Sequence, residues 1–152
     1  MKLGKGSLDK LSTVDERLQR LVHFMVGMIN DSEKDRDSLD FTITCGHRSK
    51  DEQDKISSGN TLVKWPNSKH NKSPSLAVDW AVWDPNKGEK GGIDYDDRYS
   101  YMLLGFYFEN AARLLDIPAR WGGKFRRPDS STSFRKQYGR AFEDLCHGEL
   151  IV

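Results

Sequence analysis

Apolar side chains recur at helical spacing in the first part of the chain. Between Thr13 and Asn30 they fall on one face of a helix, at Val14, Leu18, Leu21, Val22, Met25 and Ile29. Thr13 and Glu16 have the spacing of a capping box, which starts a helix by satisfying free backbone donors. The pattern therefore predicts an amphipathic helix from Thr13 to about Asn30. The charged stretch from there to Asp40 has no periodic apolar positions and is expected to be an exposed loop.

Two segments alternate apolar and polar positions with the period of a β-strand. The first runs from Leu39 to Cys45, with Leu39, Phe41, Ile43 and Cys45 on one face. The second, clearer segment runs from Leu76 to Trp83. One of its faces carries Leu76, Val78, Trp80 and Val82, and the other carries Ala77, Asp79, Ala81 and Trp83. Both segments are predicted to be strands.

The rest of the chain alternates between short elements and loops rich in Gly, Pro, Ser or charge. The predicted elements are a short helix that begins at the Ser49–Glu52 capping box and stops near Ser57, a helix from Tyr99 to Leu115, a short strand before Trp121, a helical piece from Phe134 to Phe142 and a strand from Cys146 to Val152. Loops are predicted at 59–75, 87–97 and 126–132. Helices and strands mix without the rhythm of a parallel sheet, so the predicted fold class is α+β with an antiparallel sheet.

The composition is that of one small globular domain. The 152 residues are 36% apolar and 31% charged, which allows a modest core beneath a very polar surface. The net charge of +1 argues against a protein whose main task is to bind nucleic acid. No stretch is long and apolar enough to span a bilayer, and the first residues lack the apolar segment of a signal peptide. We expect a monomer without stable membrane association, made in a cytoplasm and kept there until something releases it.

Two of the four histidines have no partner suited to metal chemistry, and the two cysteines are few for a disulfide framework. His23 lies in the first predicted helix with no acidic residue or His at a chelating spacing. His47 lies beside Arg48, whose charge would repel a metal cation. We interpret Cys45 and Cys146 as free, buried thiols of a reducing compartment, although a single bridge between them would also satisfy the sequence.

His70, Asp79 and His147 form a more specific set. His70 ends a loop, Asp79 lies in the middle of a predicted strand, and His147 lies in the last one. Two histidines and one carboxylate are a recurrent ligand set for catalytic zinc, with a fourth position for water. Such an ion lowers the pKa of water to about 7, which suits peptide hydrolysis. The bland alternative is that all three are ordinary polar residues on a half-exposed sheet.

The residues around His147 extend this set. Asp144 lies three residues before His147, at the turn into the last strand, where a carboxylate could take a proton as general base. His147 and Glu149 share one face of that strand. Cys146 points to the other face, and the alternation therefore counts against Cys146 as a metal ligand.

Short motifs in a fixed order resemble those of the zinc D-Ala-D-Ala carboxypeptidase and L-alanyl-D-glutamate endopeptidase family. They are Cys45-Gly-His-Arg-Ser49, Asp51-Glu-Gln53, Ser68-Lys-His70, Ala77-Val-Asp79, Arg120-Trp-Gly-Gly123 and Asp144-Leu-Cys-His147-Gly-Glu149-Leu. Each motif is weak alone, but the ordered set runs from about Phe41 to the C-terminus. Within the family, the chain is most similar to phage endolysins that are L-alanyl-D-glutamate peptidases.

This resemblance implies a fold, a substrate and a role for each site residue. The fold is like that of Hedgehog and the DD-peptidases, as a single catalytic domain over residues 1–152 without a separate wall-binding domain. The substrate is bacterial peptidoglycan, cut during host lysis in the periplasmic cell wall. The implied zinc ligands are His70, Asp79 and His147, with one ion per chain. The other implied roles are general base for Asp144, oxyanion or substrate-carboxylate binding for Arg48, substrate contact or ligand support for Gln53 and Ser68, and orientation of a zinc-binding His for Glu149.

The chain departs from the family pattern at two points. The family spaces its first His and Asp two residues more closely and has a Gly between them, whereas His70 and Asp79 are nine apart without a Gly. Asn71 to Ser75 is therefore expected to form a two-residue bulge beside the metal. An Asp is common after Trp-Gly-Gly in the family, whereas this chain has Lys124, which would add positive charge to the rim.

Three further alternatives compete with the endolysin hypothesis. A D-Ala-D-Ala carboxypeptidase or dipeptidase of the same family would use the same ligands. A metal-bearing but non-catalytic binding module would not need Asp144 as a base. A nucleic-acid binder that uses the four Trp residues is disfavoured by the near-zero net charge. Calcium could bind the acidic segment Asp94-Tyr-Asp-Asp97, but a solvated loop explains it as well.

Overall fold

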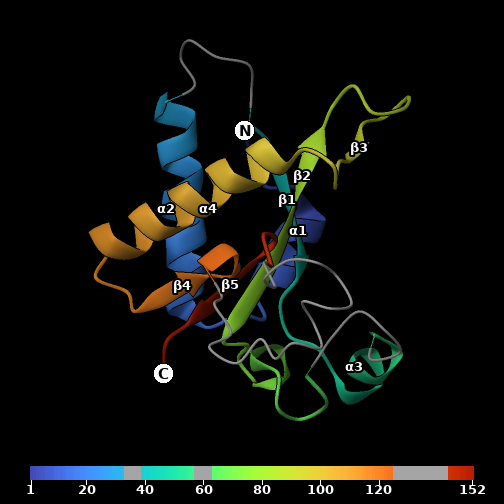
Figure 1. The fold of residues 1–152 in the computed structure, drawn as a ribbon, viewed down its shortest axis with the longest axis vertical. Helices are drawn as coiled ribbons and strands as arrows, with labels where there is room; N and C mark the ends of the chain where they lie inside the picture. Colours follow the sequence, from blue (N-terminus) through green and yellow to red (C-terminus); the bar gives the residue numbers. More distant parts are fainter. Residues whose placement is uncertain (33–38, 57–62, 125–143) are drawn as a thin grey trace, which may run out of the picture.

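Helices and strands are interleaved along the described part of the chain (Figure 1). The computed structural model describes residues 1–32, 39–56, 63–124 and 144–152. Its helices are α1 (Lys5–Leu11), α2 (Glu16–Ser32), α3 (Lys50–Ile56) and α4 (Arg98–Leu114), with 3-10 helices at Lys69–Asn71 and Gly122–Lys124. Its strands are β1 (Phe41–Cys45), β2 (Ala77–Asp84), β3 (Gly92–Ile93), β4 (Ala119–Trp121) and β5 (His147–Leu150).

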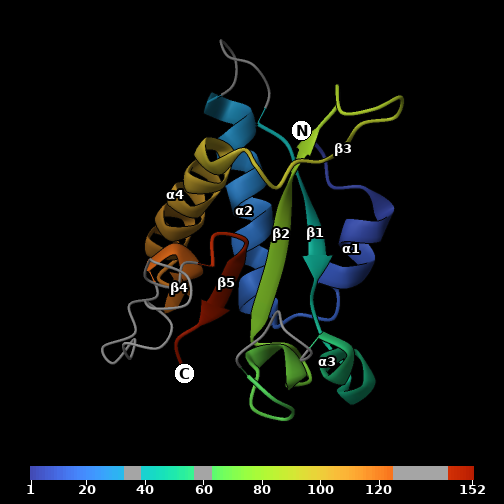
Figure 2. The ribbon, with the colours of Figure 1, turned by 45° about the vertical axis from the view of Figure 1, so that its right-hand side comes forward.

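The strands form one antiparallel sheet with β2 as its longest member. The order is β1-β2-β5-β4, and the short β3 pairs with the end of β2. Every pairing between these strands is antiparallel, which confirms the predicted α+β class. The helices α2 and α4 lie on the same side of this sheet (Figure 2).

The hydrophobic core fills the space between the sheet and these two helices. The sheet contributes one face of β1 and β2, and the helices contribute their apolar stripes; the main members are Ile43, Val78, Trp80, Val82, Leu18, Leu21, Met25, Ile29, Leu104 and Phe108. The rings of Trp80 and Phe108 meet with their centroids 5.2 Å apart. A side chain on Gly148 of β5 would collide with Phe108, since its Cβ would lie 2.6 Å from that ring. This glycine therefore lets β5 approach α4 and brings its neighbour His147 to a fixed place.

The predicted first helix is confirmed as α2, but its predicted capping box is wrong. Asp15 caps α2, because its carboxylate accepts a hydrogen bond from the Arg17 N–H at 3.0 Å. The Thr13 hydroxyl instead donates to the carbonyl of Lys10 at the end of α1. Helix α1 was not predicted, because its sequence contains Gly6, follows Gly4 and has few apolar positions. It lies beside β1, where the Ser7 hydroxyl accepts the Ile43 N–H at 3.0 Å.

The other predicted elements agree with the structure in outline. The Ser49–Glu52 capping box starts α3, with the Ser49 N–H donating to Glu52 at 2.8 Å. Helix α4 begins at Asp97, whose carboxylate accepts the Ser100 N–H at 3.0 Å. Part of the predicted loop at 87–97 forms β3, which pairs with β2. The loop predicted at 126–132 and the helix predicted at 134–142 lie outside the described residues.

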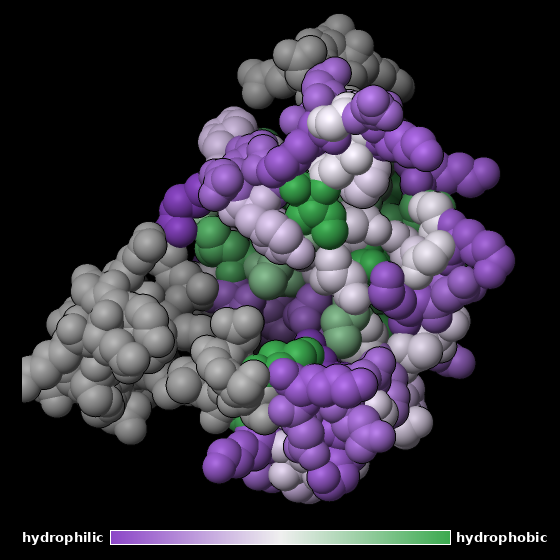
Figure 3. All heavy atoms as spheres, turned by 90° about the vertical axis from the view of Figure 1, so that its right-hand side faces the viewer, coloured by the Kyte–Doolittle hydropathy of each residue, from purple (hydrophilic) through white to green (hydrophobic). Residues whose placement is uncertain are grey.

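The surface is strongly polar, as the composition implies. On the face shown in Figure 3, hydrophilic residues dominate and apolar side chains form only small groups. Among the described residues, no helix has the length and apolar character needed to cross a membrane.

Candidate metal centre

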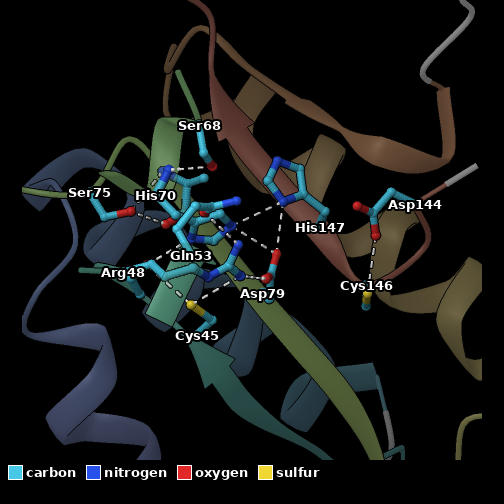
Figure 4. Close-up of polar contacts among 12 residues, drawn as sticks. Cys45, Arg48, Gln53, Ser68, His70, Ser75, Asp79, Asp144, Cys146 and His147 are labelled. Carbon is cyan, nitrogen blue, oxygen red and sulfur yellow. Dashed lines mark hydrogen bonds and ion pairs between the residues drawn. The ribbon is translucent and has the colours of Figure 1, made fainter. Parts of the chain in front are cut away.

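Three different segments of the chain bring His70, Asp79 and His147 together (Figure 4). In the register of the sheet, Asp79 of β2 pairs with His147 of β5. Their neighbours Val78 and Gly148 also pair and face the core. Because side chains alternate along a strand, Asp79 and His147 lie on the opposite face of the sheet. His70 reaches the same place from the 3-10 helix Lys69–Asn71.

The polar atoms of these three residues converge on one point. His147 Nδ1 lies 2.8 Å from Asp79 Oδ1, and His70 Nε2 lies 3.1 Å from the same oxygen. The two ring nitrogens are 3.3 Å apart. Both imidazoles are buried, with 3% and 8% of the residue exposed for His70 and His147.

In each imidazole, the nitrogen that does not contact Asp79, called the outer nitrogen below, has a partner that fixes the tautomer. His70 Nδ1 lies 2.7 Å from the carbonyl of Gly46, and His147 Nε2 lies 3.2 Å from the Glu149 carboxylate. Both partners only accept hydrogen bonds, so both outer nitrogens carry a proton. In the neutral rings, the inner nitrogens then present lone pairs toward the Asp79 oxygen. A cation placed among these three acceptor atoms would be stabilised by all of them, and two imidazole nitrogens with one carboxylate oxygen fit a metal ion.

Without a metal, protons supply this positive charge. Burial lowers the pKa of His70, but its hydrogen bond to Asp79 and that to Cys45 outweigh burial and raise the pKa to about 10. Burial likewise opposes protonation of His147, while hydrogen bonds to Asp79 and Glu149 raise its pKa to about 9. Burial would raise the pKa of Asp79, but the bonds from the two imidazoles hold it well below its usual range. The site is therefore built to attract positive charge.

Glu149 is itself held by cations behind His147. Its Oε1 accepts a hydrogen bond from Arg120 Nε at 2.7 Å, and Lys69 Nζ lies 3.4 Å from the same oxygen. Burial opposes its charged form, but the bonds to His147 and Arg120 dominate and lower its pKa to about 2. Glu149 thus stays ionised beside His147 Nε2.

Arg48 and Gln53 form a buried network beside Asp79. Arg48 Nη2 donates to Asp79 Oδ2 at 3.2 Å, and Arg48 Nη1 donates to Gln53 Oε1 at 3.3 Å. Gln53, fully buried, also donates to the Val63 carbonyl at 2.7 Å and accepts from Asn71 at 3.2 Å. Gln53 therefore holds the loops around the centre together.

Ser68 supports the centre through the backbone. Its hydroxyl accepts the N–H of His70 at 3.3 Å, and the Asn71 side chain accepts the Ser68 N–H at 3.2 Å. This reciprocal capping box fixes the short 3-10 helix that carries His70. Asn71 also donates to the Arg48 carbonyl at 3.0 Å, so the cap is tied to the Arg48 network.

Comparison with known proteins agrees with this geometry. The chain matches the family described as phage L-alanyl-D-glutamate peptidase over residues 1–151. The chain belongs to this family. It is thus a peptidoglycan-degrading enzyme of the endolysin type, specific for the bond between L-Ala and D-Glu.

A solved structure shares the fold of this peptidase. The L-Ala D-Glu endopeptidase ChiX of Serratia marcescens superposes with a TM-score of 0.66 at 18% sequence identity. The match covers 99% of this chain and 90% of that chain. At this level of identity, the likeness shows a common fold. No curated protein matches the chain.

Asp144 of the peptidase is linked to His147 through the backbone, because the His147 N–H donates to the Asp144 carbonyl at 3.3 Å, and its side chain points toward Cys146 (Figure 4). Its Oδ1 accepts a hydrogen bond from the Cys146 thiol at 3.1 Å. Its backbone N–H donates to the Gly122 carbonyl at 3.1 Å, and a Cβ on Gly122 would lie 2.3 Å from the Asp144 carbonyl oxygen. The Trp121 indole donates to the Leu145 carbonyl at 3.0 Å. The Trp-Gly-Gly motif therefore packs against the turn that carries Asp144 and fixes its backbone by hydrogen bonds.

Cys45 was missed as a residue of the peptidase site. Its sulfur lies within 4.8 Å of ligand atoms of His70 and Asp79. The predicted alternation put Cys45 on the core side with Phe41 and Ile43, and that placement is wrong. The register shifts between Ile43 and Cys45, and Cys45 consequently pairs with Asp79. The expectation of free thiols holds: Cys45 and Cys146 are unbridged, and each is half-buried.

The extra residues between His70 and Asp79 leave the ligand atoms together. They form a small loop that closes where the Leu76 N–H donates to the Lys69 carbonyl at 3.1 Å. Ser75 is then tied to the turn before α2, since the Asp15 N–H donates to the Ser75 carbonyl at 2.8 Å. The extra residues are thus held by hydrogen bonds to the N-terminal segment.

The remaining candidates have structural partners. His23 is exposed on α2, as expected, and the His47 backbone donates to the Thr13 hydroxyl at 2.8 Å. Asp94 pairs with Lys87 at 3.1 Å, and its neighbour Asp97 caps α4. These contacts account for the acidic segment without calcium. Lys124 forms a 2.6 Å ion pair with Glu109 of α4.

Proposed function

We propose that the peptidase holds one zinc ion with His70 Nε2, Asp79 Oδ1 and His147 Nδ1. The observation that supports this proposal most strongly is the meeting of three acceptor atoms within 3.3 Å of one another. Two imidazoles and one carboxylate favour zinc among the common metals and leave a further position for water or substrate. When bound, the ion supplies Lewis acidity, which polarises the scissile carbonyl and makes a water molecule more acidic.

Asp144 is proposed as the general base. Its Oδ1 is held by the Cys146 thiol, whereas its Oδ2 has no hydrogen-bond partner within the described ranges. Oδ2 can accept the proton of the attacking water and deliver it to the leaving amine of D-Glu. Asp144 packs closely against Gly122, and this contact restricts where the carboxylate can lie. The restriction supports a fixed position for proton transfer.

Arg48 is proposed as the fixed cation of the cleft. Its side chain is 12% exposed, and three neighbours hold its guanidinium: Asp79, Gln53 and Cys45. A planar cation that is already ordered stabilises a developing oxyanion without further reorganisation. D-Glu is linked through its side chain in the stem peptide, so a free α-carboxylate lies near the scissile bond. Arg48 could also pair with that carboxylate.

The family supports a proposal for the setting of this activity. We infer that the peptidase is made in the host cytoplasm and reaches the cell wall only after lysis begins. It would act there as a monomer, and the catalytic cleft itself would supply its affinity for peptidoglycan. Calcium is not part of the proposal.

Two substitutions separate the metal from the base. Asp144→Ala should keep the zinc content and the fold but lower kcat by about 100-fold or more, as expected for removal of a general base. His147→Ala should lose both zinc and activity. Elemental analysis, circular dichroism and a turbidity assay on bacterial sacculi measure the three properties. Near wild-type turnover of Asp144→Ala would assign the base elsewhere, and active protein without a transition metal would refute the zinc centre.

The cleaved bond can be read directly from the products. Purified Gram-negative sacculi are digested, the new amino groups are labelled, and the released peptides are identified by mass spectrometry. We expect D-Glu at the new amino terminus, whereas release of free D-Ala alone would indicate a carboxypeptidase. The His147→Ala protein provides the matched blank, since it differs only at one buried residue and should lack the metal.

A further inference from the structure

An irregularity in β1 turns Cys45 toward the metal centre. Ile43 pairs with Trp80, so a regular antiparallel ladder would place Cys45 opposite Val78, in the core. The register instead shifts by one residue, and Cys45 lies opposite Asp79. A bulge of this kind reverses the face on which the next side chain lies, and such bulges often occur beside active sites. The backbone therefore brings a thiol to the face that carries the proposed zinc ligands.

The contacts of this thiol are all residues of the centre. Cys45 Sγ lies within 4.8 Å of ligand atoms of both His70 and Asp79. Arg48 Nη2 lies 3.4 Å from the sulfur and 3.2 Å from Asp79 Oδ2, so it bridges the two groups. The thiol also points at the Gly46 carbonyl at 3.5 Å, the group that fixes the His70 tautomer. Figure 4 shows Cys45 and Arg48 directed toward Asp79 from the β1 side.

We propose that Cys45 is a fourth, displaceable ligand of the metal held by His70, Asp79 and His147, and this proposal rests on the zinc centre proposed above. Thiolate sulfur is among the preferred ligands of zinc. Cys45 binds by releasing its thiol proton to solvent as the sulfur–metal bond forms. It leaves when water or substrate takes the position, and it then regains a proton. The resting site is thereby closed, and the catalytic site keeps an open position.

This arrangement makes the resting enzyme sensitive to thiol reagents in a metal-dependent way. A sulfur bound to the metal is protected from alkylation, whereas the uncoordinated thiol of Cys45 can react with an alkylating reagent. Cys146 offers a matched comparison, because it is also half-buried and unbridged but bonds to Asp144. Metal should therefore protect Cys45 and leave the reactivity of Cys146 unchanged.

Cobalt(II) tests the proposal by a signal that does not depend on activity. The full-length metal-free protein is titrated with Co²⁺, whose d–d bands report occupancy and whose near-ultraviolet charge-transfer band reports sulfur ligation. We expect both signals in the unmodified protein. Cys45→Ser should keep the d–d bands and lose the charge-transfer band, while Cys146→Ser should keep both. Zinc affinity, measured by competition with a chelating dye, should fall on the order of tenfold in Cys45→Ser alone.

The outcomes distinguish the role of Cys45 from the three-ligand zinc centre on which it depends. Cobalt d–d bands with no charge-transfer band in the unmodified protein would overturn the role of Cys45 and leave the three-ligand centre in place. A band that disappears in Cys146→Ser would assign the sulfur to the other cysteine and would also overturn it. Failure to bind one Co²⁺ or Zn²⁺ per chain would refute both proposals. Peptide-level mass spectrometry of alkylation, with and without Zn²⁺, checks the unmodified protein independently of any variant.

Discussion

The partner behind each imidazole decides what the centre can bind. The Gly46 carbonyl and the Glu149 carboxylate hold the outer ring protons of His70 and His147, and both inner nitrogens therefore face Asp79 with their lone pairs. The two partners differ in strength. A carboxylate adds charge and makes the imidazole a better ligand than a neutral carbonyl does. Glu149 should consequently influence the metal without touching it.

Glu149→Gln tests this influence. The amide oxygen can still accept the hydrogen bond from His147 Nε2, but the negative charge that pairs with Arg120 and Lys69 is lost. Zinc affinity should fall by roughly 10- to 100-fold, the usual effect of removing such an outer partner. Competition with a chelating dye measures it. Glu109→Gln is the control, because Glu109 pairs with Lys124 on α4 and should leave the affinity unchanged. Equal affinities in the two variants would contradict the role of Glu149.

The sequence indicated which three candidate residues would lie together, but it did not reveal the other groups that contact them. His70, Asp79 and His147 were identified because their chemistry and order are visible in the chain, and the structure brings them within 3.3 Å. Cys45 was placed on the wrong face, because alternation assumes a regular strand and nothing in the composition of β1 reveals a bulge. The role of the Gly46 carbonyl was invisible for a different reason, since a backbone group carries no residue signature.

At the scale of elements, the turn between α1 and α2 clamps two loops of the centre. The Thr13 hydroxyl accepts the His47 N–H, and the Thr13 carbonyl accepts the Ser75 N–H at 3.0 Å. One loop carries Gly46, and the other follows His70. Gly46 is packed so closely that an added Cβ would lie 2.3 Å from the Lys10 carbonyl and 2.4 Å from the Thr13 hydroxyl. The N-terminal helices thus position a centre to which they contribute no ligand.

Gly46→Ala should separate the two loops from this clamp. The methyl group would force backbone atoms apart, because the nearest contact is a carbonyl and cannot rotate away. We expect a loss of about 1–3 kcal/mol of stability, typical of overpacking, together with weaker zinc binding through the displaced Gly46 carbonyl. Urea unfolding with and without zinc measures both. Gly27→Ala in α2 has open space around its Cβ and should instead gain up to about 1 kcal/mol. Destabilisation in both variants alike would argue against a specific clamp.

Elements with strong periodicity were predicted, and elements that depend on tertiary contacts were not. Helices α2 and α4 and strand β2 each bury a continuous apolar stripe, which leaves a period in the sequence. Helix α1 buries only Ser7 and Leu11, and Ser7 matters through its bonds to β1. Strand β3 has two residues and exists only because β2 extends beyond its other partners. Such elements are determined by their neighbours, which a single sequence does not display.

At the scale of the whole molecule, the centre couples folding to protons and to metal in opposite ways. The metal-free fold binds protons at His70 and His147 more tightly than an unfolded chain does, because Asp79 attracts them. Zinc needs the same nitrogens without their protons. Metal binding near neutral pH must therefore expel protons, and acid must weaken the metal-bound fold before it weakens the metal-free one.

This competition predicts stability curves with opposite slopes. The folded pKa values of His70 and His147, about 10 and about 9, lie above the ordinary value of 6.5. A raised pKa contributes stability that is complete below the ordinary value and is lost as pH rises through the folded value. The metal-free protein should thus lose stability between about pH 7 and pH 10. With zinc at about a thousand times its Kd, the ion should add about 4 kcal/mol, and this gain should grow with pH as proton competition ends.

Urea midpoints measured at several pH values, with excess chelator and with saturating zinc, check this prediction. Tyr101 also disfavours the folded state in strong base, since burial raises its pKa to about 12, so the slope needs an internal reference. His147→Ala provides that reference: its metal-free curve should be flatter, and zinc should no longer raise it. His23→Ala should behave like the unmodified protein, because His23 is exposed on α2. A metal-free midpoint that stays constant from neutral pH to pH 10 would mean that the buried histidines are not holding protons in place of a metal, and the three acceptors would then need another explanation.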